Sequence, residues 1–134
     1  MELKELTTKI LGKNVIYYES IDSTQLEILR KIDNIPNGTI IIADIQTNGI
    51  GTHGRKWHTT EKNNIAFSFI IYANCNIEKL EGITKEIAET MVIAIKNLYN
   101  ISLHIKEPND IVYNNKKIGG ILTQNKLNGK KVKY

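Results

Sequence analysis

The residue types best suited to chemistry lie in one short stretch, GIGTHGRKWH, which runs from Gly49 to His58. Its three glycines fit the G-x-G-x-x-G pattern of a dinucleotide site, and the stretch also approaches the G-x-x-x-x-G-K-[ST] phosphate loop. Both patterns use glycine so that backbone N–H groups can approach phosphate. A dinucleotide site also needs a helix that begins at the loop, but the following RKWHTTEKNN has no apolar periodicity. The phosphate loop fails because Trp57 follows Lys56 where Ser or Thr should hold Mg²⁺. The stretch is therefore neither of these two nucleotide sites.

The same stretch still has two interpretations. Arg55 can hold a phosphate bidentately, glycine N–H groups can form a concave anion site, and Trp57 can cover a flat base. Alternatively, it is a surface loop whose Trp57 packs onto the core. The spacing of the residues does not decide between an anion-binding loop and a plain surface loop.

The elements that must position this loop follow from the apolar periodicity and the turn residues. Thr24 followed by Glu27 resembles a capping box at a helix start, and the run TIIIADI is apolar enough for a central strand. We expect helices at 2–11, from Thr24 and at 83–99, strands at 15–18, 39–45, 65–73 and 102–106, a turn at 34–38, and hairpins at 111–124 and at Asn128-Gly129. Irregularly interspersed helices and neighbouring strands predict an α+β domain with a mostly antiparallel mixed sheet flanked by helices.

Length and composition limit the classes of protein. A chain of 134 residues is the size of one domain, and no apolar run approaches the roughly 20 residues that span a bilayer. The N-terminus lacks the apolar region of a signal peptide, and the single Cys75 cannot form an internal disulfide, so we expect a cytoplasmic protein. The net charge of +4 permits an anionic ligand but gives no argument for DNA.

Four separate groups of residues together resemble the biotin protein ligase family. They are Ile21–Thr24 (IDST), Gln46 with the G-x-G-x-x-G-R-x-W run of Gly49–Trp57, Lys106 with Pro108–Asp110 (K-x-P-N-D), and Lys117–Leu122 (K-x-x-G-I-L). They occur in the order and spacing of the family and extend over most of the chain. Four matches are far more specific than any one of them.

The resemblance implies a class II synthetase-like core and a two-step reaction. The carboxylate of biotin would attack the α-phosphate of ATP, with Mg²⁺, to give biotinyl-5′-adenylate and pyrophosphate. A lysine of a biotin carboxyl carrier protein domain would then attack the adenylate. Neither step needs a protein nucleophile, so catalysis would consist of positioning and of neutralising negative charge.

The resemblance also implies a role for each matching residue. The catalytic residues would be Lys106 and Arg55. The biotin-binding residues would be Ser23, Thr24, Gln46, Gly49 and Gly120. The ATP- and adenylate-binding residues would be Gly51, Gly54, Arg55, Trp57, Asn109 and Asp110. Four of these residues keep a structural alternative. Lys106 could be a surface lysine of a strand, and Arg55 could be a solvated arginine of the loop. Thr24 could cap a helix, and Asp110 could anchor a turn. No residue is assigned as a metal ligand.

The chain departs from the family pattern in three ways. Ile50 and Thr52 stand where the family usually has arginines, and Glu107 replaces an aromatic residue that helps to line the biotin side. The sequence also stops where the family continues, so we expect residues 1–134 to be the N-terminal part of a catalytic domain. Neither an N-terminal DNA-binding domain nor a C-terminal β domain is expected, and uncovered apolar faces favour a homo-oligomer.

Three other functions remain open at this stage. A lipoate or octanoate ligase-like transferase would require a longer apolar channel. A non-catalytic ligand-binding or assembly module descended from the ligase would keep the motifs without turnover. A nucleic-acid-binding role would require a clustered basic face.

Overall fold

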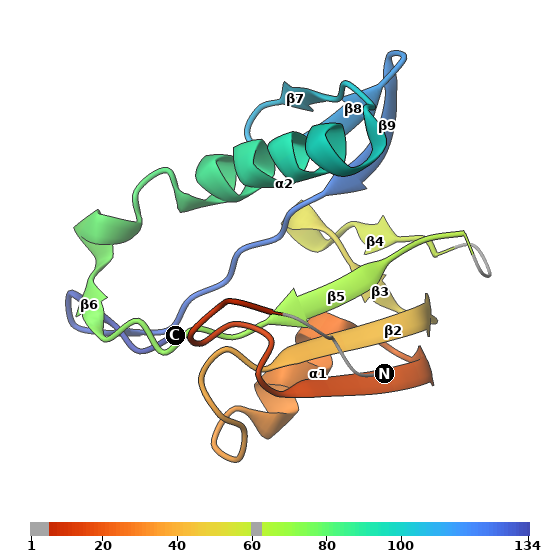
Figure 1. Ribbon diagram of the computed structural model, residues 1–134. Coiled ribbons are helices and arrows are strands. Elements are labelled where there is room, and N and C mark those ends of the chain that lie inside the picture. Colours follow the sequence, from red (N-terminus) through yellow and green to blue (C-terminus); the bar gives the residue numbers. More distant parts are fainter. Residues whose placement is uncertain (1–5, 60–62) are drawn as a thin grey trace. The chain divides into compact units, whose positions relative to one another are not determined.

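The computed structural model describes residues 6–59 and 63–134, and its elements are labelled in Figure 1. The chain divides into two compact units, Met1–Ala73 with Tyr134 and Asn74–Lys133. The described residues contain two α-helices and short sheets in which all strand pairs but one are antiparallel. The expected α+β class is confirmed.

The first unit is built on a three-stranded sheet of order β1-β2-β5. β1 (Val15–Ile21) pairs in parallel with β2 (Ile40–Gln46), and β2 pairs antiparallel with β5 (Ala66–Phe69). The apolar run TIIIADI thus forms the centre of the sheet, as predicted, because a strand with a neighbour on each side must bury more of its surface.

Helix α1 (Thr24–Lys31) connects the two parallel strands and contacts the sheet through β2 and β5 (Figure 1). Its N-cap is Ser23, whose side chain accepts a hydrogen bond from the backbone N–H of Leu26. The expectation of a capping box at Thr24 is therefore wrong by one position. The carboxylate of Glu27 bonds to side chains on β1 and α1 and not to the cap.

The core of the first unit is a cluster of buried isoleucines, one from the helix and two from the sheet region. Ile28, Ile41 and Ile70 are its fully packed members. Half-buried side chains surround them, namely Ile16, Tyr18, Ile32, Ile35, Tyr72 and Tyr134. This apolar contact fixes α1 against the sheet and so determines where the IDST segment lies.

Residues 6–11 do not form the opening helix that the sequence predicts. Residues 6–11 are irregular or in a turn, and residues 2–5 lie outside the part of the chain that the structure describes. A helix this short is marginal unless it packs. The segment instead meets a turn, where the N–H of Gly12 donates to the carbonyl of Gly38 (2.9 Å). A Cβ at Gly38 would lie 2.4 Å from the carbonyl oxygen of Ile10, so only glycine permits this approach.

The expected strand at 65–73 is shorter than predicted, since β5 ends at Phe69. Beyond it, the N–H of Ile70 donates to the carbonyl of Thr39 (3.2 Å) and the N–H of Tyr72 donates to the side chain of Asn37 (2.9 Å). The apolar run therefore continues as a segment bound to the preceding turn, because that turn satisfies its backbone groups.

The second unit contains the long helix, two small sheets and a 3₁₀ turn. Its elements are β6 (Cys75–Asn76), the 3₁₀ helix η2 (Ile77–Leu80), α2 (Ile83–Tyr99), β7 (His104–Lys106), β8 (Asp110–Tyr113), β9 (Lys116–Gly120), β10 (Leu127–Asn128) and β11 (Lys131–Val132). The strands form sheets of order β7-β8-β9 and β10-β11-β6, and α2 contacts β7 and β8 (Figure 1).

Helix α2 has the predicted bounds, but its apolar face is only partly covered. Ala88 is buried, Ile87 and Met91 are half-buried, and Leu98 in the last turn is 74% exposed. The packing of the second unit is therefore concentrated on the first half of the helix. In the described residues, no helix is sufficiently long and apolar to span a membrane.

The two hairpins of this unit follow their turn residues. Asn114 and Asn115 both have positive φ, at 47° and 60°, between β8 and β9. Gly129 has a φ of 62° between β10 and β11. Asn and Gly adopt this left-handed backbone most readily, which confirms both predicted turns.

Candidate functional site

The IDST segment and the end of β2 meet in a polar cluster within the first unit. The side-chain oxygen of Gln46 accepts hydrogen bonds from the backbone N–H of Thr24 (2.9 Å) and from its hydroxyl (3.1 Å). Thr24 and Ser23 are 3% and 1% exposed, and Gln46 is half-buried. The structure thus brings three of the predicted biotin-binding residues together.

Two further polar residues, Ser68 and Gln25, belong to this cluster, and neither was predicted from the sequence. The hydroxyl of Ser68 on β5 lies 2.8 Å from the hydroxyl of Thr24 and donates to the side-chain oxygen of Gln25 (3.2 Å). The signal was a small polar residue inside the apolar run IAFSFII. The cluster therefore presents several neutral donors and acceptors, which can form hydrogen bonds but carry no charge.

An ionic network holds the start of α1 in place. The guanidinium of Arg30 pairs with Asp22 and with Glu27, and Asp22 accepts the N–H of Ser23 (2.7 Å). Hydrogen bonding from Arg30 lowers the pKa of the Asp22 carboxyl below its usual value. The same interaction is the largest cause that lowers the pKa of Glu27. Both carboxylates are therefore ionised beside the cap of α1.

The glycine stretch forms a small hairpin and not an open loop. β3 (Gly49–Ile50) pairs with β4 (Lys56–Trp57), and the 3₁₀ turn η1 (Thr52–Gly54) joins them. No α-helix begins there, which agrees with the rejection of the dinucleotide pattern. A Cβ at Gly49 would lie 2.6 Å from the carbonyl oxygen of Trp57 and 3.1 Å from Nε2 of Gln46. Gly49 therefore allows the hairpin to lie directly against the polar cluster.

Arg55 and Trp57 of the hairpin differ in exposure, since Arg55 is exposed and Trp57 is half-buried. Arg55 is exposed and folds back, with Nε donating to the carbonyl of Thr52 (3.1 Å) and an Nη to its hydroxyl (2.8 Å). Trp57 is half-buried opposite Gly49. The N–H of Gly51 donates to the carbonyl of Arg55 (2.7 Å), so this amide closes the hairpin. Gly54 has a φ of 72°, which explains a glycine at the tip.

The remaining predicted residues lie in the second unit, around the β7–β8 turn. Lys106 ends β7, is exposed and lies opposite Asp110, which in turn lies opposite the exposed Gly120 of β9. Asn109 holds the turn through two bonds to Ile121, since its carbonyl accepts an N–H (2.9 Å) and its amide donates to a carbonyl (3.0 Å). The carboxylate of Asp110 pairs with Lys117 at 2.6 Å, which supports the anchoring alternative for this residue.

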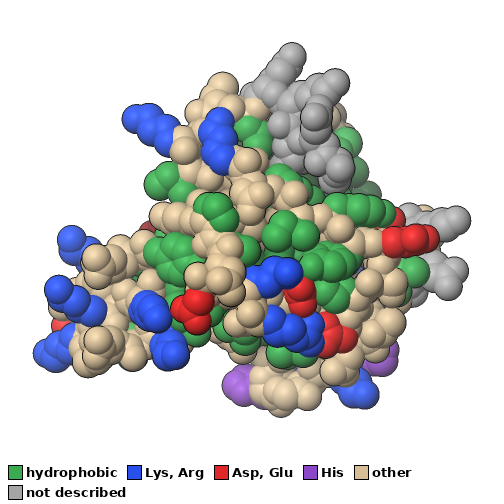
Figure 2. Space-filling model, turned by 90° about the horizontal axis from the view of Figure 1, so that it is seen from below, with side chains coloured by type: hydrophobic (Ala, Val, Ile, Leu, Met, Phe, Trp, Pro, Cys, Tyr) green, Lys and Arg blue, Asp and Glu red, His purple; other side chains and the backbone are tan. Residues whose placement is uncertain are grey.

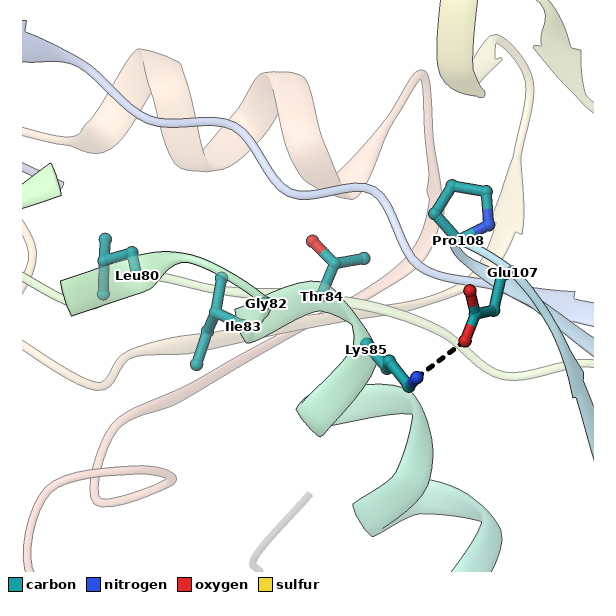
Figure 3. A pocket seen from close by; sticks show the side chains of 7 residues that line it. All are labelled: Leu80, Gly82, Ile83, Thr84, Lys85, Glu107 and Pro108. Carbon is teal, nitrogen blue, oxygen red and sulfur yellow. Dashed lines mark hydrogen bonds and ion pairs between the residues drawn. The ribbon is translucent and has the colours of Figure 1, made fainter. Parts of the chain in front are cut away.

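The non-matching Glu107 has a partner on α2. Its carboxylate lies 2.6 Å from the ammonium of Lys85, and the pair borders a pocket of about 270 Å³ (Figure 3). The pocket is lined by Leu80, Gly82, Ile83, Thr84, Lys85, Glu107 and Pro108. Hydrogen bonding between the two groups lowers the pKa of Glu107 and raises that of Lys85, so both are charged at neutral pH. An ion pair therefore stands at the position where the resemblance implied an aromatic residue.

The described residues do not offer a protein cage for Mg²⁺. In residues 6–59 and 63–134 no group of three His, Cys, Asp or Glu side chains could hold a metal ion. Mg²⁺ binds few protein carboxylates when it accompanies nucleotide phosphates.

The first unit is a small α+β core in which a cluster of neutral hydrogen-bonding side chains lies beside a glycine hairpin. The sequence profile of the Biotin/lipoate A/B protein ligase family matches residues 17–134. The chain belongs to this family, and the resemblance to the biotin protein ligase catalytic domain is confirmed.

Individual relatives give the same result. The chain is 37% identical over 120 residues to the bifunctional ligase/repressor BirA of Bacillus subtilis, which covers 89% of this chain and 37% of the relative. It is 28% identical to BirA of Escherichia coli over 97% of this chain and 40% of the relative. The biotin protein ligase of Aquifex aeolicus, solved in complex with biotin and ATP, is similar with a TM-score of 0.69 and 32% identity, over 90% of this chain and 49% of that one. The chain thus spans less than half the length of these relatives.

Proposed function

We propose that the chain provides the biotin-activating part of a biotin protein ligase. It would bind biotin and ATP, form biotinyl-5′-adenylate and serve the transfer of biotin to a lysine of a carrier protein domain. The observation that carries the proposal is the Thr24–Gln46–Ser68 cluster beside Gly49, in a chain similar to a ligase solved with biotin and ATP.

The polar cluster suits the ureido ring of biotin. A ureido group has two N–H donors and one carbonyl acceptor and carries no charge, so it needs neutral partners in a desolvated site. Gln46 points its oxygen at Thr24, which leaves its Nε2 beside Gly49 as a donor for a carbonyl. A hydroxyl group can both donate and accept, so Ser23, Thr24 and Ser68 can match either partner by exchanging one of their present hydrogen bonds.

The first step would join biotin to ATP. A carboxylate oxygen of biotin forms a bond to the α-phosphorus, the bond between the α- and β-phosphates breaks, and pyrophosphate leaves with the electron pair. We assign Lys106 as the compact cation that neutralises the charge between the carboxylate and the α-phosphate, and Arg55 as a phosphate partner. Arg55 would have to leave Thr52 in order to grip the phosphate with both nitrogens.

We propose nucleotide-binding roles for residues of each unit by itself. Gly51 and Gly54 would admit the phosphate, Trp57 would cover the adenine, and Asn109 and Asp110 would border the nucleotide. In the second step the amine of the carrier lysine forms an amide with the acyl carbon of biotin, AMP leaves, and the amine loses its proton to solvent.

A substitution that replaces a single donor atom of Gln46 tests the assignment of the biotin site. Gln46→Glu keeps the oxygen that accepts from Thr24 but replaces the Nε2 donor by a second oxygen. We expect the affinity for biotin in calorimetry to fall roughly tenfold, because a buried carbonyl then lacks its donor. The matched control is Asn48→Asp, which adds the same charge two residues away at an exposed position. Equal affinities for Gln46→Glu and wild type would refute the assignment.

The same calorimetry compares biotin with lipoate. The neutral hydrogen-bonding cluster favours biotin, since the dithiolane ring of lipoate has no N–H donor and no carbonyl for Gln46 or Thr24. Equal affinity for lipoate would instead support the lipoate ligase-like alternative.

We also propose that the chain forms a homo-oligomer, because large apolar side chains are exposed. Ile65 is 83%, Leu98 74% and Tyr99 69% exposed, and hydrophobic side chains reach the surface on the face that Figure 2 shows. Exposed apolar area of this kind marks contact surfaces. Light scattering after gel filtration measures the oligomeric state, and a monomer at all concentrations would exclude the proposal.

A further inference from the structure

We infer that Lys85 is a positioning residue for Lys106, acting through its ion pair with Glu107. The inference rests on the proposed function, in which Lys106 neutralises charge at the reacting phosphate. It concerns only the second unit, which contains all three residues.

The ion pair ties the β7–β8 turn to the first turn of α2. The ammonium of Lys85 lies 2.6 Å from the Glu107 carboxylate, and the two side chains point toward each other (Figure 3). Lys85 is itself fixed at the start of the helix, where its N–H donates to the carbonyl of Gly82 (2.9 Å). The helix therefore provides a rigid support for the side chain that holds Glu107.

The peptide unit between Lys106 and Glu107 is held from both of its ends. On the sheet side, Lys106 lies opposite Asp110, and Asn109 is bonded to Ile121. On the helix side, Glu107 is bonded to Lys85. Because the direction of a side chain follows from its backbone, fixing this peptide fixes the direction in which the Lys106 side chain leaves the strand.

The pair matters more for this direction than for the stability of the fold. The side chains of Lys85 and Glu107 are 52% and 67% exposed, and exposed ion pairs contribute little to stability. A small displacement of a catalytic cation is costly by comparison, since misplacement by about 1 Å can reduce a rate about a hundredfold. Removing the pair should therefore lower the rate without unfolding the chain.

The test combines a rate with a measurement of order. In Lys85→Met and in Glu107→Gln, we expect kcat for biotin-dependent exchange of pyrophosphate into ATP to fall by about tenfold or more, with KM for biotin unchanged. The double variant should be no slower than either single one, because both changes remove the same contact. Lys85→Arg retains the pair and should retain the rate.

The readout of order is the backbone NMR order parameter at Lys106 and Glu107. It should fall in Lys85→Met and stay at the wild-type value in Lys85→Arg. The matched control is Lys96→Met, which removes an exposed lysine of the same helix whose side chain the structure gives no partner in the described residues. It should change neither the rate nor the order parameter.

The outcomes separate the two proposals. Unchanged order at Lys106 in Lys85→Met, additive losses in the double variant, or an equal loss in Lys96→Met would overturn the positioning role. A wild-type chain that exchanges no pyrophosphate would overturn the proposed function, and the order parameter would then decide the positioning role alone.

Discussion

Gly49 is the position where a single added methyl group should disturb the candidate biotin site most. In Gly49→Ala the new Cβ would lie 2.6 Å from the carbonyl oxygen of Trp57, a backbone atom that cannot rotate away. It would also lie 3.1 Å from Nε2 of Gln46. Ordinary contact begins at 3.4 Å, so β3 and β4 would have to separate by about 0.8 Å at this rung or bend.

The size of the effect follows from these two contacts. Overpacking by one methyl group costs about 1–3 kcal/mol of the free energy of unfolding. For a unit of this size, at about 4–8 °C per kcal/mol, that lowers the melting temperature by roughly 4–24 °C. Displacement of Gln46 would weaken one hydrogen bond to biotin, which corresponds to about a three- to tenfold loss of affinity.

Trp57 makes this prediction easy to measure, since it is the only tryptophan and lies in β4. Its fluorescence during urea unfolding reports on the hairpin, and calorimetry gives the affinity for biotin. The control is Gly54→Ala, where no atom lies within 4 Å of the added Cβ and only the positive φ is strained. If Gly49→Ala lost no more stability and no more affinity than Gly54→Ala, the close approach of the hairpin to Gln46 would be wrong.

Two further predictions concern the network at α1 and the hairpin. Hydrogen bonding from Arg30 lowers the pKa of Asp22 and of Glu27 in the folded chain. The two carboxylates therefore stabilise the fold fully at any pH above their pKa values in the unfolded chain. This stabilisation is lost as the pH falls through their lowered pKa values in the folded chain. Urea unfolding should show the free energy of unfolding falling as the pH drops below about 5. Arg30→Gln should make this decline shallower, and an equal slope in both proteins would contradict the network. Amide hydrogen exchange across Gly49–Lys56 should be slower with the adenylate bound than without it, because the hairpin has few backbone hydrogen bonds of its own and its glycines favour opening. Slow exchange that ligand does not change would exclude this ordering.

Elements with strong local signals were predictable from the sequence. Helix α2 has the predicted bounds because its apolar period continues over four turns, from Ile83 to Tyr99. The two hairpins follow Asn and Gly residues that tolerate positive φ. Their information is local, so no knowledge of the packing was needed.

The predicted bounds were wrong where contacts between distant parts of the chain determine the local structure. At residues 6–11 the expected helix is replaced by an irregular segment in which Ile10 lies against Gly38. The end of the strand expected at 65–73 is bound by Thr39 and Asn37. Residues this distant in sequence leave no periodic signal.

In the candidate site, too, residues with a local sequence motif could be predicted, whereas residues brought in by tertiary contacts could not. The motif residues Thr24 and Gln46 could be named from the sequence, and the structure brings them into hydrogen-bonding contact. Ser68 could not, because its role depends on the pairing of β5 with β2. The partner of Glu107 was also hidden, since Lys85 lies 22 residues away on a different element.

The most direct test of the central claim is biotin-dependent exchange of labelled pyrophosphate into ATP by the 134-residue chain. The account predicts exchange by the wild type, a loss of about 10²–10³ in rate for Lys106→Ala with a much smaller loss of biotin affinity, and poor rescue by Lys106→Arg, whose planar guanidinium differs from a compact ammonium. Biotin binding without any exchange would show a non-catalytic binding module. Exchange at the wild-type rate in Lys106→Ala would show that Lys106 is only an exposed strand lysine, and the proposed mechanism would be wrong.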